Sequence, residues 1–291
     1  KVFFVSASTL VNWEELTEMF PTGPEGKTRV YSTLQGALDD AESGGNDLIF
    51  VADNHTETIT AAAGISVSKN GVTIIGLGVG DERPLISYST AVGADFDITG
   101  NGVHIENIRF DLTGIDALTG PVDVNAAGCE FKNCEFIVAD GSGQAVVGIV
   151  TDNTADYFVV DDCVFTGTSI AGSTSAIRIV GGQKAIIKNS YIDGNWKLTA
   201  GGIEVTTTAA GFLKIENCIV RNNTASAASA INFIGGTTAV VAGCRLGIRT
   251  GTVPISLNEG ANGNGGGKAG VVMTSGNWYK AATTIAAGTL L

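Results

Sequence analysis

Two aspartates occupy equivalent places in the sequence. Asp97 is the middle residue of Phe96-Asp-Ile98, and Asp123 is the middle residue of Val122-Asp-Val124. In a strand whose apolar residues face a core, both carboxylates point outward. Two close carboxylates can share a proton, bind Ca²⁺ or flank a glycosidic bond. Asp97 and Asp123 are thus the best catalytic candidates, but the simpler interpretation, two solvated acids among 29 Asp and Glu residues, is favoured because no third partner accompanies them.

A second group of side chains has the composition of a metal site. His104, Glu106 and Glu130 are expected on one outward face. Lys132 belongs to the same face, and a cation there favours a solvated surface over a metal centre. His55 has no partner that the sequence reveals. We predict no metal and no cofactor.

Trp196 and Arg178 are the remaining candidates for chemistry. Trp196 lies in the loop Asp193-Gly-Asn-Trp-Lys197, where its ring either offers a platform for a sugar or folds back against the body of the protein, and the second is favoured. Arg178 is the only basic residue at its outward position, and we expect Glu204, at the same position one repeat later, to neutralise it.

A repeated segment positions all of these residues. Gly128-Cys-Glu-Phe-Lys-Asn-Cys-Glu-Phe136 alternates apolar and outward residues up to an Asn and continues with a small residue and a Phe. The Asn-equivalent positions are 107, 133, 162, 189, 217 and 243, at spacings of 26 to 29 residues. Such a period indicates stacked supersecondary units. Short strands without intervening helices predict an all-β parallel β-helix of about 7–9 coils, with an N-terminal α-helical cap.

Residues at the same position of successive repeats form a column along the stack. Two of these columns have structural explanations. The Asn column suits a tight left-handed bend with hydrogen bonds between copies, and its members are Asn107, Asn133, Asp162, Asn189 and Asn217. The next position is filled by Cys134, Cys163, Cys218 and Cys244, and by Ser190 in another repeat. Small residues there indicate inward thiols that pack in the core, as does Cys129. No paired Cys and His spacing suggests zinc.

Outward columns carry information about stacking and about partners. One column alternates in charge: Glu106, Lys132, Asp161, Lys188 and Glu216. Stacked coils would place opposite charges side by side and so favour one register. Two other columns are apolar, and they consist of Val159, Ile186 and Val240, and of Val164, Tyr191 and Ile219. Two apolar columns on one face predict that the C-terminal segment or another copy of the chain covers them.

The ends of the chain differ from the repeat. Asn12 is expected to cap a first helix, and Ser32-Thr-Leu-Gln35 resembles a capping box before a second, amphipathic one. This second helix is the candidate cap over the open end of the solenoid. We therefore divide the chain into a cap region (1–45), a solenoid (46–280) and an apolar tail (281–291).

Composition narrows the classes of partner. The net charge is −12 with a pI near 4.5. An acidic surface repels phosphate backbones and anionic lipid headgroups, so neither nucleic acid nor a membrane is an expected partner.

Particular segments resemble a known family. Tyr31-Ser-Thr-Leu-Gln-Gly-Ala-Leu38, Asp47-Leu-Ile-Phe-Val51, Thr56-Glu-Thr-Ile59 and the Asn column are similar to the pectate-lyase-like right-handed, single-stranded β-helix superfamily. More narrowly, the N-terminal block resembles structural β-helix proteins of tailed bacteriophages, on Val2–Val5, Phe20-Pro21, Val30–Thr33, His55–Thr58, Val72–Gly78 and Arg83-Pro84. That resemblance implies a virion component, commonly a homotrimer. The polygalacturonase-like sequences Asn-Thr-Asp, Gly-His-Gly and Arg-Ile-Lys are absent.

These observations predict a non-enzymatic structural protein of a tailed-phage virion, located in the particle as a capsid decoration, head fibre or spike. Its expected partners are itself, as a homotrimer, and other virion proteins such as the major capsid protein. The alternative is a glycoside hydrolase, polysaccharide lyase or binding protein acting on a host-surface glycan. A third interpretation is a secreted adhesin.

Overall fold

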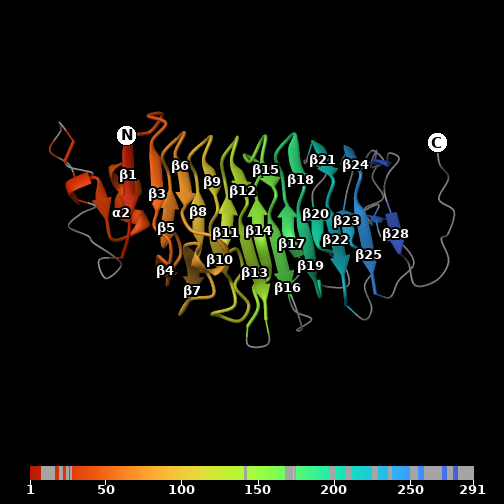
Figure 1. Ribbon diagram of the computed structural model, residues 1–291. Coiled ribbons are helices and arrows are strands. Elements are labelled where there is room, and N and C mark those ends of the chain that lie inside the picture. The colour runs from red at the N-terminus through yellow and green to blue at the C-terminus, as the bar shows by residue number, and fades with distance from the viewer. Residues whose placement is uncertain are drawn as a thin grey trace.

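The protein forms a rod of stacked coils with a short helix at its N-terminal end (Figure 1). The computed structural model describes residues 1–7, 17–19, 22–23, 26, 28–140, 143–167, 173, 175–196, 201–206, 211–224, 229–234, 238–249, 255–258, 271–273 and 278–280. The predicted cap at Asn12 and the tail 281–291 lie outside these residues.

Three parallel sheets run the length of the rod, and each coil contributes one strand to each sheet. Sheet A is ordered β2 (Val30–Tyr31), β1 (Val2–Val5), β3 (Leu48–Val51), β6 (Thr73–Gly76), β9 (His104–Glu106), β12 (Glu130–Lys132), β15 (Val159–Asp161), β18 (Ala185–Lys188), β21 (Phe212–Glu216), β24 (Thr238–Ala242) and β27 (Val271–Met273). Sheet B runs β4 (Thr56–Ile59), β7 (Leu85–Tyr88), β10 (Arg109–Asp111), β13 (Glu135–Ala139), β16 (Val164–Gly167), β19 (Tyr191–Gly194), β22 (Ile219–Asn222), β25 (Arg245–Ile248) and β28 (Trp278–Lys280).

Sheet C completes the cross-section with β5 (Ile65–Val67), β8 (Phe96–Ile98), β11 (Val122–Val124), β14 (Val147–Thr151), β17 (Ser175–Ile179), β20 (Ile203–Val205), β23 (Ile231–Ile234) and β26 (Ile255–Asn258). Its eight strands mark eight coils. The architecture is a parallel β-helix, as the repeat predicts.

Alternating burial along the short strands produces the core. In β12 only Phe131 is buried, and in β11 only the outer two residues are. Phe110, Phe136 and Phe165 stack from coil to coil, with ring centroids 4.9 and 4.5 Å apart and nearly parallel planes. All five cysteines are buried and none forms a disulfide, as expected for thiols that pack in the core.

The Asn column forms the bend between sheets A and B. All six positions have positive φ, from 51° at Asn133 to 64° at Gly243. Side-chain bonding between copies is seen at one rung, where Asn133 Nδ2 donates to Asn107 Oδ1 at 3.1 Å. Asn189 instead donates to Asp161. The backbone supplies the regular ladder, because each bend N–H donates to the carbonyl before the next bend, as from Asn133 to Asp161 at 3.0 Å.

Helix α2 (Leu34–Asp40) closes the N-terminal end. Its buried residues Leu34, Ala37 and Leu38 belong to the same core as the first coils, so the expected cap is confirmed. The capping residue is Thr33, whose hydroxyl accepts from Gly36 N, one residue later than the predicted box. Gln35 does not reach back, because its side chain accepts from Ser66 N on β5.

The N-terminal region shares a sheet with the solenoid. Strand β1 lies between β2 and β3, and Val2 to Val5 pair with Leu48 to Val51. The first residues of the chain therefore extend sheet A by pairing beyond the first coil. One short 3₁₀ turn, η1 (Gly80–Glu82), also lies on the surface. Within the described residues, no helix is long and apolar enough to cross a membrane.

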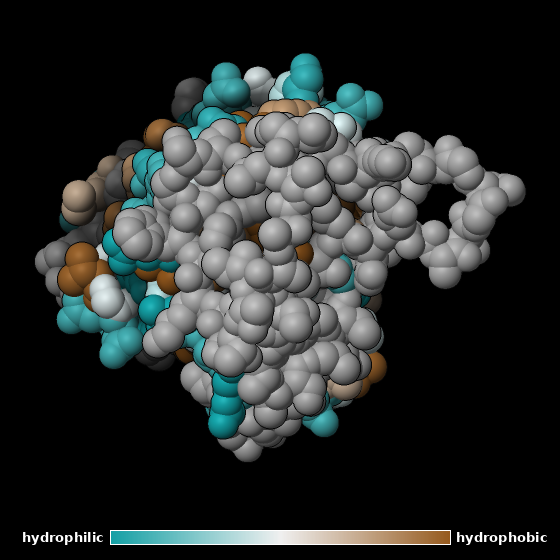
Figure 2. Space-filling view, turned by 90° about the vertical axis from the view of Figure 1, so that its right-hand side faces the viewer, coloured by the Kyte–Doolittle hydropathy of each residue, from teal (hydrophilic) through white to brown (hydrophobic). Residues whose placement is uncertain are grey.

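The two apolar outward columns lie on two different sheets, which corrects the prediction of a single face. Val159 and Ile186 stand on sheet A, and Val164, Tyr191 and Ile219 on sheet B. Lys214 separates Ile186 from Val240 and interrupts the first column. Seen from the C-terminal end, hydrophilic and hydrophobic residues are interleaved around the rim (Figure 2).

Replacing Asn133 with Ala tests the left-handed bend. We expect a loss of about 2 kcal/mol, because a Cβ-bearing residue without a local hydrogen bond costs about 1–2 kcal/mol in this conformation and the bond to Asn107 is lost. Asn133→Gly should lose about half as much, since Gly adopts positive φ freely. Urea-induced unfolding followed by circular dichroism measures both. Equal losses in the two variants would contradict this account of the bend.

Candidate functional site

The outward column of sheet C contains the predicted carboxylate pair. Asp97 on β8 pairs in register with Asp123 on β11, as expected. Asn125, which follows β11, donates from Nδ2 to Asp97 Oδ1 at 3.1 Å. The pair is therefore held by a neighbouring amide and stands on two rigid strands.

Two further acids, which sequence reasoning missed, join this pair. Asp95 precedes β8 and Asp152 follows β14, so both stand at ends of sheet C strands. Asp95 accepts from the backbone N–H of Ala63. The only sequence clue is that each lies next to a strand triplet of the repeat, Asp95 before Phe96-Asp-Ile98 and Asp152 after Ile149-Val-Thr151. Together the four carboxylates form an acidic patch on the outer face of sheet C.

Mutual repulsion and burial alter proton affinity in the acidic patch. Burial raises the pKa of Asp123, a hydrogen bond from Asn125 opposes this, and the charges of Asp97, Asp95 and Asp152 raise it further. Burial also raises the pKa of Asp95, with Asp97 adding to the effect. A carboxyl with a raised pKa can hold and donate a proton at mildly acidic pH.

Arg178 is not available to act as a base beside the acids. Its Nε donates to Glu204 Oε2 at 2.7 Å, in the register predicted from the sequence. Glu204 is 6% exposed, and Ser175 Oγ lies 3.4 Å from the same oxygen. Glu204 is buried and Arg178 is partly exposed, and together they form an ion pair on the outer face.

The second predicted cluster is a charge network. His104 Nδ1 lies 3.1 Å from Glu130 Oε2, and His104 Nε2 lies 3.3 Å from Glu106 Oε2. Lys132 Nζ also pairs with Glu106, at 3.2 Å. Burial alone would raise the pKa of Glu106, but His104 and Lys132 hold this pKa below its ordinary value. Across the described ranges, no group of three or more His, Cys, Asp or Glu side chains is placed to hold a metal ion.

His55 has a partner that the sequence did not reveal. The ring is 1% exposed, and Nε2 lies 3.3 Å from Glu57 Oε2. The same Glu57 oxygen accepts from Leu34 N at the start of α2. Glu57 therefore ties the first coil to the cap helix, and the i to i+2 spacing of His55 and Glu57 was the available clue.

Trp196 is fully buried, so its ring presents no face to a sugar. Its indole N–H donates to Arg221 O at 2.9 Å. Gly167 and Gly194 lie against the ring, and a Cβ on Gly194 would come within 2.7 Å of it. The favoured interpretation, in which the ring folds back against the solenoid, is the one the structure shows.

No protein-family model and no curated protein matches the chain. Similar solved structures include a rhamnogalacturonan lyase, with 12% identity over 82% of this chain and 74% of that one and a TM-score of 0.43. Pectate lyase II from Xanthomonas campestris pv. campestris has 12% identity over 86% and 78%, with a TM-score of 0.46. ORF18 of Geobacillus virus E2 has 11% identity over 85% and 57%, with a TM-score of 0.35. Likeness at these identities concerns the fold alone.

The substitution Asp123→Asn tests how much the burial and charge repulsion of Asp123 destabilise the fold. Because the folded-state pKa of Asp123 is raised, its ionisation opposes folding, and this cost grows as pH rises from the ordinary Asp range through the raised value. We expect the variant to melt at a higher temperature than the wild type at pH 7 and at nearly the same temperature at pH 4.

Differential scanning calorimetry at both pH values measures this difference. Asp116→Asn, at an exposed loop acid, is the matched control and should shift the melting temperature equally at the two pH values. A stabilisation by Asp123→Asn that is the same at pH 4 and pH 7 would contradict the repulsion.

Proposed function

We propose that the protein is a non-enzymatic structural component of a tailed-phage virion, a β-helix rod that decorates the capsid or forms a short fibre or spike as a homotrimer. The observation that carries the proposal is the presence of apolar outward columns on two adjacent sheets at the same coils. The resemblance of the N-terminal block to phage structural proteins supports the virion setting.

The two apolar columns lie at the same height along the rod, which is what a closed ring of copies requires. Val159 and Val164 belong to one coil, and Ile186 and Tyr191 to the next. In a ring with cyclic symmetry, the same coil of every copy lies at the same height. Sheet A of one copy would then pack its apolar column on the sheet B column of its neighbour. Val164, at 38% exposed, would be covered by this contact.

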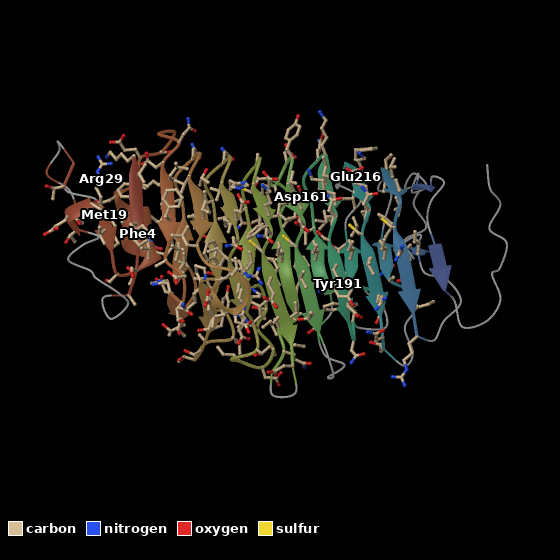
Figure 3. All side chains as sticks on the ribbon, in the orientation of Figure 1. Phe4, Met19, Arg29, Asp161, Tyr191 and Glu216 are labelled. Carbon is tan, nitrogen blue, oxygen red and sulfur yellow. The ribbon has the colours of Figure 1, made fainter. Side chains whose placement is uncertain are left out.

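Charged side chains beside these columns are used to join coils. Lys188 pairs with Asp161 at 3.1 Å, and Lys132 pairs with Glu106 on the preceding coil. Figure 3 shows Asp161 and Glu216 along one row of the rod, with Tyr191 below them. Such pairs add about 0.2–1 kcal/mol each and act mainly on register. These charged side chains thus hold neighbouring coils in register, which fits a structural role better than a catalytic one.

A cysteine pair at the proposed contact tests the ring. Val159→Cys with Val164→Cys places one thiol on each apolar column of the same coil, on two sheets that diverge at the Asp162 bend. Mild oxidation should give disulfide-linked trimers of the double variant on a non-reducing gel. The buried native thiols should not interfere.

Each single variant is the control and should remain monomeric on the gel. Dimers from a single variant would indicate a two-fold contact, and a monomeric mass of the wild type in native mass spectrometry would overturn the trimer. Absence of the chain from purified particles, by peptide mass spectrometry, would overturn the virion role.

A second candidate function is action on a host-surface polysaccharide, which the raised pKa of Asp123 beside Asp97 favours. In this case Asp123 would supply a proton and Asp97 a carboxylate. Capsular and O-antigen polysaccharides incubated with the protein would be assayed for new reducing ends and for unsaturated products. Activity that Asp97→Asn and Asp123→Asn abolish, with the fold retained, would replace the structural proposal.

A further inference from the structure

One column at the start of the sheet A strands changes character midway along the rod. Six successive coils place a residue with positive φ there: Asn46 (50°), Gly71 (73°), Gly102 (67°), Gly128 (72°), Tyr157 (59°) and Lys184 (60°). Glycine adopts this conformation freely, whereas a side chain costs roughly 1–2 kcal/mol in it. A bulky ring at positive φ is unusual, and such strain concentrates at functional sites.

The substituted positions form an exposed stack. Lys184 Nζ lies 4.9 Å from the centre of the Tyr157 ring and 3.2 Å from its hydroxyl oxygen. Tyr157 is 55% exposed. In the next coil, the pairing of Ala185 with Leu213 brings Phe212, 42% exposed, beside Lys184. Three neighbouring coils therefore present an aromatic ring, a cation and a second aromatic ring to solvent.

One side of the Tyr157 ring faces a coil with no side chain at the matching position. Gly128 N donates to Asp156 O, which sets Gly128 directly beside Tyr157 in the stack. Gly102 and Gly71 continue this bare column. Lys184 Nζ approaches the ring from the following coil, and the glycine column places no side chain on the other side.

Lys184 takes no part in the ion pairs that join the coils. Lys132 and Lys188 each pair with a carboxylate on the preceding coil, and Lys214 pairs with Glu216 on its own strand. In the part of the chain that the structure describes, the only polar contact of Lys184 Nζ is the Tyr157 hydroxyl. The remaining N–H groups of this ammonium can donate to a ligand.

We propose that Tyr157, Lys184 and Phe212 form a binding site for a strand of neutral polysaccharide. The C–H faces of hexopyranose rings pack on aromatic rings, and their hydroxyls can both accept from Lys184 and donate to carboxylates. The preceding coil carries Glu130, two residues beyond Gly128, and the chain has a net charge of −12. Both features disfavour an acidic glycan.

This site is separate from the acidic patch and from the Asn bend. It lies at the start of the sheet A strands, whereas the acidic patch lies on sheet C and the Asn bend at the opposite end of the same strands. Tyr157 and Lys184 lie two residues before Val159 and Ile186, so the site borders the proposed trimer contact on sheet A. The site does not depend on a virion role.

Restoring glycine is the sharpest test, because Tyr157→Gly and Lys184→Gly insert the residue that earlier coils use at this position. Both variants should fold with a melting temperature no lower than that of the wild type. The probe is an array of neutral hexose and N-acetylhexosamine oligosaccharides beside uronate-containing ones. The wild type should retain neutral oligosaccharides, and each variant should bind the best of them at least tenfold more weakly by calorimetric titration.

Phe212→Ala provides a second variant, with an expected loss of the same sign, and Val92→Ser, at another exposed apolar residue, is the control that should bind like the wild type. No retained oligosaccharide, or binding that none of the three variants weakens, would overturn the proposal. Exclusive binding of uronates would overturn the neutral assignment. A large loss of stability in Tyr157→Gly together with unchanged binding by Phe212→Ala would show that the stack is structural only.

Discussion

Parallel pairing at a fixed spacing is the constraint on which the whole molecule depends. Strands of successive coils lie about 4.8 Å apart, so each side chain meets the residue at the same position one coil away. Residues in one core column must therefore pack closely on one another, as the stacked rings of Phe110, Phe136 and Phe165 do. A charged outward column must alternate in sign, as from Glu106 to Lys188, or tolerate repulsion, as in the acidic patch.

Residues that obey this constraint could be predicted from the sequence. The Asn bend, the buried thiols, the pairing of Asp97 with Asp123 and the contact of Arg178 with Glu204 each follow from counting positions in the repeat. The column to which a residue belongs does not depend on its side-chain conformation, so one amino-acid sequence is enough to assign it. The same counting identified the helix that closes the first coil.

Other features depend on contacts outside the repeat, and these were missed. Asp95 and Asp152 stand beyond the strand ends, where loop lengths vary, so their approach to Asp123 has no periodic signature. The contact of Glu57 with His55 and Leu34 joins the solenoid to a non-repeating segment. The bend between sheets A and B separates columns that seem to share a face when only residue alternation is considered.

The alternating charge of the column from Glu106 to Glu216 has a consequence for how such a rod can evolve in length. Duplication of one coil would lengthen the rod by one strand spacing and leave both ends unchanged. It would also place two like charges in contact at the point of insertion, because the column changes sign at every coil. Insertions of two coils avoid this repulsion. Selection on charge alone would therefore favour rods whose lengths differ by even numbers of coils.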